Sequence, residues 1–267
     1  MEKGMKKLIL SGLVCLMAVI GTGWAPAGAQ ESKLDSMAVS LRAEMGYTYY
    51  ALDSDVDVSG DGDEAVCQSI MDVTVGSTVF YDRFAFDVYA RLPVVDIDNE
   101  MEGNFIQEAE IDRFELGSAL SYQLTEQMGC FLGLRYGSSD VDSVNSPGTF
   151  VAQDESWSFT TYGPTAGMNY GWVINKHVFN LQGGLGYMYG DYEHDGGYGE
   201  DSIDASVNSL GYVAGLQYRY LINNQWDFRV TGDAYYFDFG DFSYGNGDKG
   251  ELEESTASVR LGFTYTF

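Results

Sequence analysis

Two acidic stretches carry side chains that could together activate a water molecule. Asp140 and Asp142 lie two residues apart, and His194 lies further along the chain beside two candidate partners, Asp191 and Asp195. Two carboxylates held close together can share a proton, and an imidazole held by a carboxylate can act as a general base. These residue types allow a hydrolytic site. The competing interpretation is a turn at the aspartates and an ordinary loop histidine among acids.

A second group of acids has the spacing of a calcium-binding loop. Hard oxygen ligands at positions 1, 3, 5, 9 and 12 of such a loop converge on one cation. Those positions are occupied by Asp53, Asp55, Asp57, Asp61 and Glu64. Val58, however, stands where an EF-hand has its turn glycine, and no flanking helices are expected. We therefore expect solvated surface loops and no cofactor, and calcium at the acidic loops is the alternative.

The segments that must position these loops alternate apolar and polar residues. From residue 39 to 49 the odd positions are Val, Leu, Ala, Met, Tyr and Tyr, and the even positions are Ser, Arg, Glu, Gly and Thr. A period of two is that of a β-strand with one apolar face. Ten such strands are predicted, at residues 39–52, 65–76, 78–93, 110–124, 127–137, 156–173, 177–190, 203–221, 225–239 and 254–267.

The connections between these strands alternate between short and long. Tight turns are predicted at 76–77, 125–126, 175–176 and 223–224. The long loops are 53–64, 94–109, 138–156, 191–203 and 240–253. The long loops hold 24 acids and a single lysine, so they would concentrate cations. Short turns on one side and long loops on the other are typical of a transmembrane β-barrel, which has an even number of strands.

The polar faces of the predicted strands hold every arginine of the chain. An arginine that faced lipid at the bilayer midplane would cost about 2–4 kcal/mol, so the polar faces should line the lumen. We expect a charge ladder that fills the lumen, and a selective pore lined by charges is the alternative. The ladder is predicted to contain Arg42, Glu44, Asp72, Arg83, Asp87, Arg91, Arg113, Glu115, Arg135, Arg219, Asp227, Arg229, Asp233 and Arg260.

The first 29 residues have the order of a secretory signal peptide. A basic start is followed by an apolar run at 8–20 and by the small residues Ala27, Gly28 and Ala29. The run is too short for a membrane-spanning helix, so a cleaved leader and a single domain at 30–267 are expected. Without that leader the formal charge is near −28, which argues against nucleic acid as a partner.

The last strand carries the most specific pattern. It has a polar residue at Arg260, a glycine at Gly262 and aromatic residues at Tyr265 and the terminal Phe267. This stretch resembles the C-terminal signal of bacterial outer-membrane β-barrels. The resemblance implies that the strand closes the barrel and is recognised by the barrel-assembly machinery. It also implies that the surrounding partners are outer-membrane lipid and lipopolysaccharide.

Together these patterns predict an all-β fold, a single antiparallel transmembrane barrel of ten strands with short periplasmic turns and long acidic extracellular loops. We expect a non-enzymatic protein, either membrane-structural, surface-binding or a narrow porin-like channel. The strand number, the final strand, the Asp140 and Asp142 pair before the Ser-Pro-Gly-Thr of 146–149, and His194 also resemble the omptins, outer-membrane endopeptidases. That resemblance implies the alternative, a protease, although Tyr192 stands where omptins have an aspartate.

Overall fold

The computed structural model describes residues 37–56, 63–102, 108–144, 154–195, 203–244 and 248–267. They form ten strands joined by antiparallel pairing, which confirms the predicted fold class. Within these residues no helix has the length and apolarity to cross a membrane. The strands are β1 (Ala38–Val56), β2 (Asp63–Tyr81), β3 (Phe84–Glu102), β4 (Glu108–Gln123), β5 (Met128–Val144), β6 (Asp154–Ile174), β7 (His177–Asp195), β8 (Ile203–Leu221), β9 (Trp226–Tyr244) and β10 (Asp248–Thr266).

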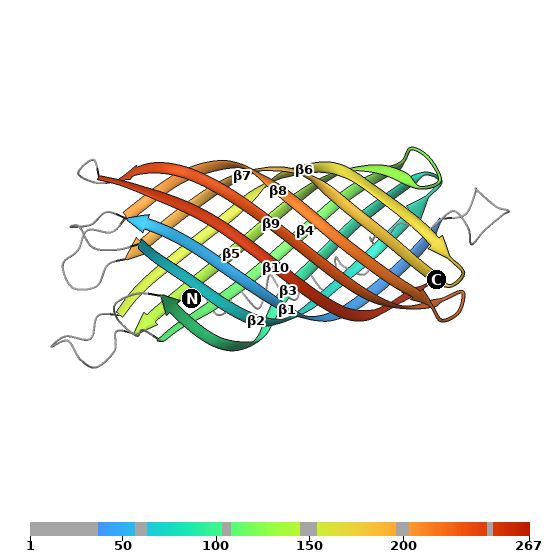
Figure 1. Cartoon of the computed structure of the whole chain (residues 1–267), viewed down its shortest axis with the longest axis horizontal. Helices are drawn as coiled ribbons and strands as arrows, with labels where there is room; N and C mark the ends of the chain where they lie inside the picture. Colours follow the sequence, from blue (N-terminus) through green and yellow to red (C-terminus); the bar gives the residue numbers. More distant parts are fainter. Residues whose placement is uncertain (1–36, 57–62, 103–107, 145–153, 196–202, 245–247) are drawn as a thin grey trace.

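The sheet closes on itself through the first and last strands. Each strand pairs with its sequence neighbours, and β1 also pairs with β10. The closing register places Leu41 opposite Tyr265 and Met45 opposite Leu261, and the backbone N–H of Phe267 donates to the Val39 carbonyl at 2.9 Å. Closure leaves no edge strand in the barrel, as a structure in a bilayer requires. Among the described residues, the pairing of β3 with β4 covers only residues 84–91 of β3, and that of β8 with β9 covers only residues 212–221 of β8, so these two pairs separate toward the long-loop end. The strands cross the barrel at a steep tilt (Figure 1).

The two faces of each strand have opposite character. On β1, Leu41, Met45 and Tyr47 are exposed on the outside, whereas Glu44 and Thr48 are buried inside. Period-two alternation therefore sorts the side chains as expected from the sequence. The apolar skin lies outside and the charged residues lie within, which is the reverse of a soluble protein.

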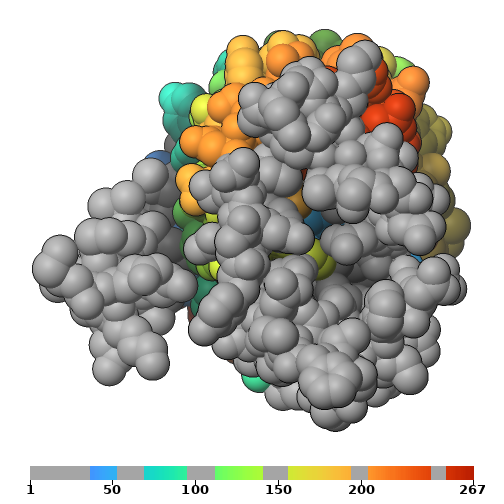
Figure 2. All heavy atoms as spheres, turned by 90° about the vertical axis from the view of Figure 1, so that its left-hand side faces the viewer, coloured from blue at the N-terminus to red at the C-terminus, as the bar shows by residue number. Residues whose placement is uncertain are grey.

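Three of the four short connections lie where the sequence predicts them, at 124–127, 175–176 and 222–225. Asn175 has the left-handed φ of 57° that a tight turn requires. The Asn223 side-chain oxygen accepts from the backbone N–H groups of Gln225 at 2.9 Å and Trp226 at 2.8 Å. These turns lie at the same end as the C-terminus (Figure 1, right). Figure 2 views the opposite end, where the longer connections start and finish.

The predicted turn at residues 76–77 is wrong. β2 continues to Tyr81, and the chain turns at Asp82 and Arg83, where Asp82 has a φ of 52°. Gly76 has a different role, because a Cβ there would lie 2.8 Å from the guanidinium carbon of Arg42. The glycine makes room for a lumenal arginine and does not bend the chain.

Candidate functional site

The lumen contains a continuous set of ion pairs, which begins near the short-turn end. Arg42 on β1 donates to Asp87 on β3 through both terminal nitrogens, at 2.6 and 3.1 Å. Arg219 donates to Asp227 at 2.6 Å. Arg42 and Asp87 form a bidentate ion pair between strands that are not neighbours, so this pair spans part of the lumen.

The next ion pairs lie further along the barrel axis. Glu44 accepts from the Thr231 hydroxyl at 2.8 Å, and its Oε1 lies 3.1 Å from Nε of Arg229. Asp233 forms ion pairs with Arg260 and with Arg91, the latter at 3.2 Å. These contacts join β1, β3, β9 and β10 across the inside of the barrel.

Glu115 is the centre of the densest part of this network. It is 2% exposed and accepts hydrogen bonds at 2.8 to 3.2 Å from Tyr89, Arg135 and Tyr235. Its Oε2 also lies 3.6 Å from Arg91 and 3.9 Å from Arg113. β4 and β9 lie on opposite sides of the ring of strands, so the contact between Glu115 and Tyr235 crosses the whole lumen.

Glu254 is a lumenal carboxylate outside the predicted charge ladder. It is completely buried and accepts a hydrogen bond from Arg113 at 2.8 Å. The sequence contains evidence for this position, because Glu254 lies an even number of residues before Arg260 and so on the same strand face. Glu254 is absent from the predicted charge ladder because it is the first residue of the predicted strand.

One predicted member of the charge ladder is not in the lumen. Arg83 is exposed in the turn between β2 and β3, because the strand boundary lies later than predicted. With Arg83 removed and Glu254 added, the charge ladder has seven arginines and seven carboxylates among the described residues. Its members are Arg42, Arg91, Arg113, Arg135, Arg219, Arg229, Arg260, Glu44, Asp72, Asp87, Glu115, Asp227, Asp233 and Glu254.

Beyond the charge ladder, toward the long-loop end, the lumen is apolar. The alternation along the sequence does not predict this apolar layer. Phe159 packs edge-on against Phe239 with 5.3 Å between ring centroids, and Phe237 and Met188 have no exposed surface. The layer consists of Tyr50, Leu52, Ile70, Trp157, Phe159, Met188, Tyr192, Ala205, Val207, Tyr235, Phe237, Phe239 and Leu252.

The apolar layer and the charge ladder meet through arginine–aromatic contacts. The guanidinium carbon of Arg135 lies 3.5 Å from the centroid of the Tyr235 ring, and that of Arg113 lies 4.1 Å from the Tyr50 ring. Desolvated contacts of this kind are each stabilising by about 2 kcal/mol. The two halves of the lumen are therefore one packed interior.

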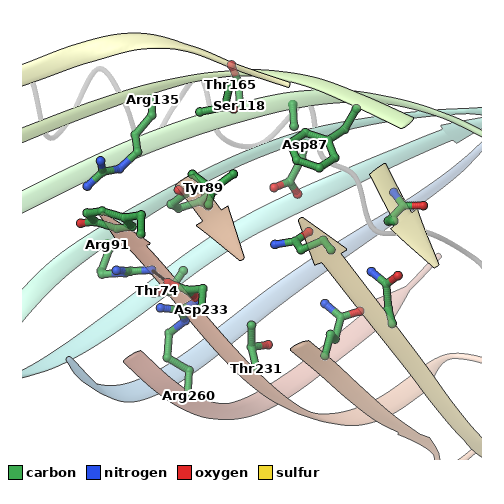
Figure 3. A pocket seen from close by; sticks show the side chains of 18 of the residues that line it. Thr74, Asp87, Tyr89, Arg91, Ser118, Arg135, Thr165, Thr231, Asp233 and Arg260 are labelled. Atoms are coloured by element: carbon green, nitrogen blue, oxygen red, sulfur yellow. Dashed lines mark hydrogen bonds and ion pairs between the residues drawn. The ribbon is translucent and has the colours of Figure 1, made fainter. Parts of the chain in front are cut away.

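A cavity of about 250 Å³ remains on the short-turn side of the apolar layer (Figure 3). Arg91, Arg135 and Arg260 line it together with Tyr89 and Asp233. The view in Figure 3 shows these five side chains gathered on one side.

The predicted hydrolytic residues are not brought together as far as the structure describes them. Asp140 and Asp191 are both exposed, and Asp191 accepts a hydrogen bond from Ser206 at 3.0 Å. They lie on β5 and β7, which are separated by β6. Asp142 and His194 lie further along the same two strands, and their side chains are outside the described part.

The predicted calcium ligands lie partly in strands. Asp53 and Asp55 are in β1 and Glu64 is in β2, opposite Ser54, while Asp57 and Asp61 are outside the described residues. Where side chains are described, no group of three or more metal-ligating residues occurs.

The residues of the C-terminal pattern lie on both faces of β10. Arg260 and Gly262 are buried on the lumenal face, and a Cβ at Gly262 would meet the Ala43 carbonyl oxygen of β1. The Tyr265 ring lies 4.9 Å from Trp226 and 4.8 Å from Phe267. The closing strand thus combines close backbone contact with an outer aromatic cluster.

No family model and no curated protein matches the chain. Among solved structures, outer membrane protease OmpT from Escherichia coli is similar, with a TM-score of 0.62 and 11% identity over 86% of this chain and 97% of that one. The translocator domain of autotransporter NalP from Neisseria meningitidis gives a TM-score of 0.49 and 13% identity over 99% and 96%. At these identities the likeness concerns the fold. The chain is a ten-stranded closed antiparallel β-barrel whose structural neighbours are outer-membrane β-barrels.

Proposed function

We propose that this protein is an integral outer-membrane barrel with a closed lumen and a non-enzymatic role. It would anchor in the membrane through its strands and present acidic loops at one end. The observation that carries the proposal is the apolar layer, in which Tyr50, Phe237, Met188 and Leu252 are completely buried. Side chains with no accessible surface admit no water between them, and a packed layer of this kind favours a closed lumen over an open channel.

The outer surface supports the membrane assignment through two aromatic belts. Tyr136, Tyr162 and Tyr189 are register partners eight to twelve residues from the short-turn ends of β5, β6 and β7, and Trp172 stacks on Phe179 near the short-turn end. The ten residue steps from Tyr162 to Trp172 span about 33 Å along β6 at roughly 3.3 Å each. A strand tilt of about 40° reduces this to about 25 Å along the membrane normal, the height of the apolar band of such barrels.

Between the belts the outer surface is apolar. Leu132, Leu210 and Leu261 are each more than half exposed, as is Tyr212. A soluble protein rarely exposes a continuous apolar surface of this extent, whereas lipid requires one. The C-terminal pattern supports the further proposal that the barrel-assembly machinery inserts the chain among outer-membrane lipid and lipopolysaccharide after a leader at 1–29 directs its export.

The closed lumen is tested by conductance in planar bilayers. The wild-type protein is expected to give no stepwise current. The double variant Phe159→Ala, Phe237→Ala removes two rings from the apolar layer and is expected to conduct, because truncated aromatic side chains leave a cavity. The matched control, Phe228→Ala with Phe263→Ala, removes a ring pair from the outer surface and should stay silent. Wild-type currents equal to those of the double variant would show a channel instead.

The protease alternative has its own test. Detergent-folded protein with lipopolysaccharide is expected to leave basic peptides intact, because Asp140 and Asp191 point outward on strands that are not neighbours. Cleavage products detected by mass spectrometry, and lost in the His194→Ala variant, would establish the hydrolytic site and refute the non-enzymatic role.

A further inference from the structure

The lumenal cavity has two chemically different walls. One wall belongs to the charge ladder and includes Arg91, Arg135 and Arg260. The opposite wall, from β6 to β8, is polar and uncharged and is formed by Thr165, Asn169, Asn180, Gln182 and Gln217. The space exists because these shorter neutral side chains do not reach the arginines across the lumen.

Several hydrogen-bonding groups on these walls are unused. Within the described residues, Nε and Nη1 of both Arg91 and Arg135 have no hydrogen-bond partner, although Nη1 of Arg91 lies 3.6 Å from Glu115. These nitrogens have almost no accessible surface, so the guanidinium groups must rotate for a bound group to reach them. Both arginines are more than nine-tenths buried. Buried donors are normally satisfied, so the site calls for a group rich in acceptor oxygens. Asn169 adds one unpaired side-chain oxygen, so one donor on the bound species could also be used.

The charge of the cavity lining points to an anion. Five arginines line the space, Arg42, Arg91, Arg135, Arg229 and Arg260. Four carboxylates line it, Glu44, Asp87, Glu115 and Asp233. The side chains that line the cavity therefore carry one excess positive charge, whereas the whole charge ladder is neutral. A single negative charge would balance the lining itself.

We propose that this cavity binds a small oxyanion, with Arg91 and Arg135 as its principal donors. A planar guanidinium matches two oxygens of a carboxylate or phosphate, which favours these anions over a halide. About 250 Å³ limits the species to a few heavy atoms beyond the oxyanion itself. The lining reaches Ala85 and Ser121 at the short-turn ends of β3 and β4, and the apolar layer closes the other end. Entry is therefore from the short-turn end.

The test is isothermal titration of detergent-folded protein with sodium acetate and with sodium phosphate, at constant ionic strength maintained with sodium chloride. Binding heat is expected with at least one oxyanion and not with chloride. Heat with acetate alone assigns a carboxylate ligand, and heat with phosphate alone assigns a phosphate ligand. Binding of neither anion by the folded protein would mean that the cavity holds only water, and would overturn the proposal.

Two variants and one matched control locate the binding. Arg135→Gln removes donors, and Thr165→Leu fills the cavity without changing any charge. Each is expected to weaken binding by about tenfold or more, because charge-assisted hydrogen bonds are lost or blocked. Ala166→Leu, the next residue on β6, changes the exposed outer face and should bind as wild type does. Unchanged affinity in both Arg135→Gln and Thr165→Leu would place the anion elsewhere. This inference rests on the proposed closed lumen only for the route by which the anion enters. If the lumen is open, the conductance experiment shows it independently of the anion titration.

Discussion

Glu115→Leu is expected to lower the free energy of unfolding by about 3–5 kcal/mol, the usual cost of removing one partner from a buried ion pair. Glu115 is the common partner of Arg91, Arg113 and Arg135, and its Oε2 lies 3.1 to 3.9 Å from a nitrogen of each. Without it, three guanidinium groups of like charge face one another in an interior that water reaches poorly. Urea unfolding of the protein in lipid or detergent, followed by tryptophan fluorescence, measures the loss.

Two comparisons make this result specific to the buried charge. Glu126→Leu changes a carboxylate in the exposed turn between β4 and β5 and should alter stability by less than about 0.5 kcal/mol. The double variant Glu115→Leu, Arg135→Leu removes a positive charge along with the negative one, so it should be less destabilising than the sum of the single variants. Strict additivity, or a Glu115→Leu variant as stable as wild type, would show that the charge ladder does not hold the barrel together.

Most of the charge ladder could be predicted from the sequence because lipid imposes a strong rule on arginine. Each strand has a lipid face and a lumenal face, so the position of Arg42 or Arg229 fixes which residues lie inside. The rule needs correct strand ends. It failed for Arg83, because Gly76 and Ser77 have the composition of a turn, and only the position of Arg42 shows that Gly76 makes room for a side chain.

The apolar layer could not be predicted by the same rule. Alternation identifies an apolar face when the other face is polar, but near the long-loop end both faces of a strand are apolar. On β9, Phe237 and Phe239 continue the lumenal face of Asp233, while Tyr236 lies outside. Near this end the alternation does not distinguish the two faces of the strand, because both are apolar. Only the closed ring of strands shows which face lies in the lumen.

The hydrolytic hypothesis rests on spacing along the chain and makes no use of the strand faces. Asp140 lies an odd number of residues after Arg135, so the two lie on opposite faces of β5 if the strand continues that far. The structure extends β5 to Val144, beyond the predicted end at residue 137, and Asp140 is exposed. Because the predicted strand ends at residue 137, Asp140 is expected in a loop. In the structure it lies on the outer face of β5.

Leu132→Arg is expected to destabilise the barrel by about 2–4 kcal/mol if its outer face meets lipid. Leu132 is 61% exposed and lies on β5 midway between Met128 at the short-turn end and Tyr136 in the aromatic belt. In a soluble barrel, the same substitution at so exposed a leucine would change stability by less than about 0.5 kcal/mol. One substitution therefore distinguishes a membrane barrel from a soluble one.

A substitution closer to the membrane surface provides the control. Met128 is also exposed but lies at the first position of β5, about 10 Å along the membrane normal from Leu132 for a tilted strand. Met128→Arg should cost no more than about 1 kcal/mol, because an arginine near the interface reaches water and headgroups. Unfolding of both variants in lipid vesicles gives the comparison. Equal small costs at the two positions would contradict the membrane assignment, whereas a penalty confined to Leu132 would locate the bilayer midplane on β5.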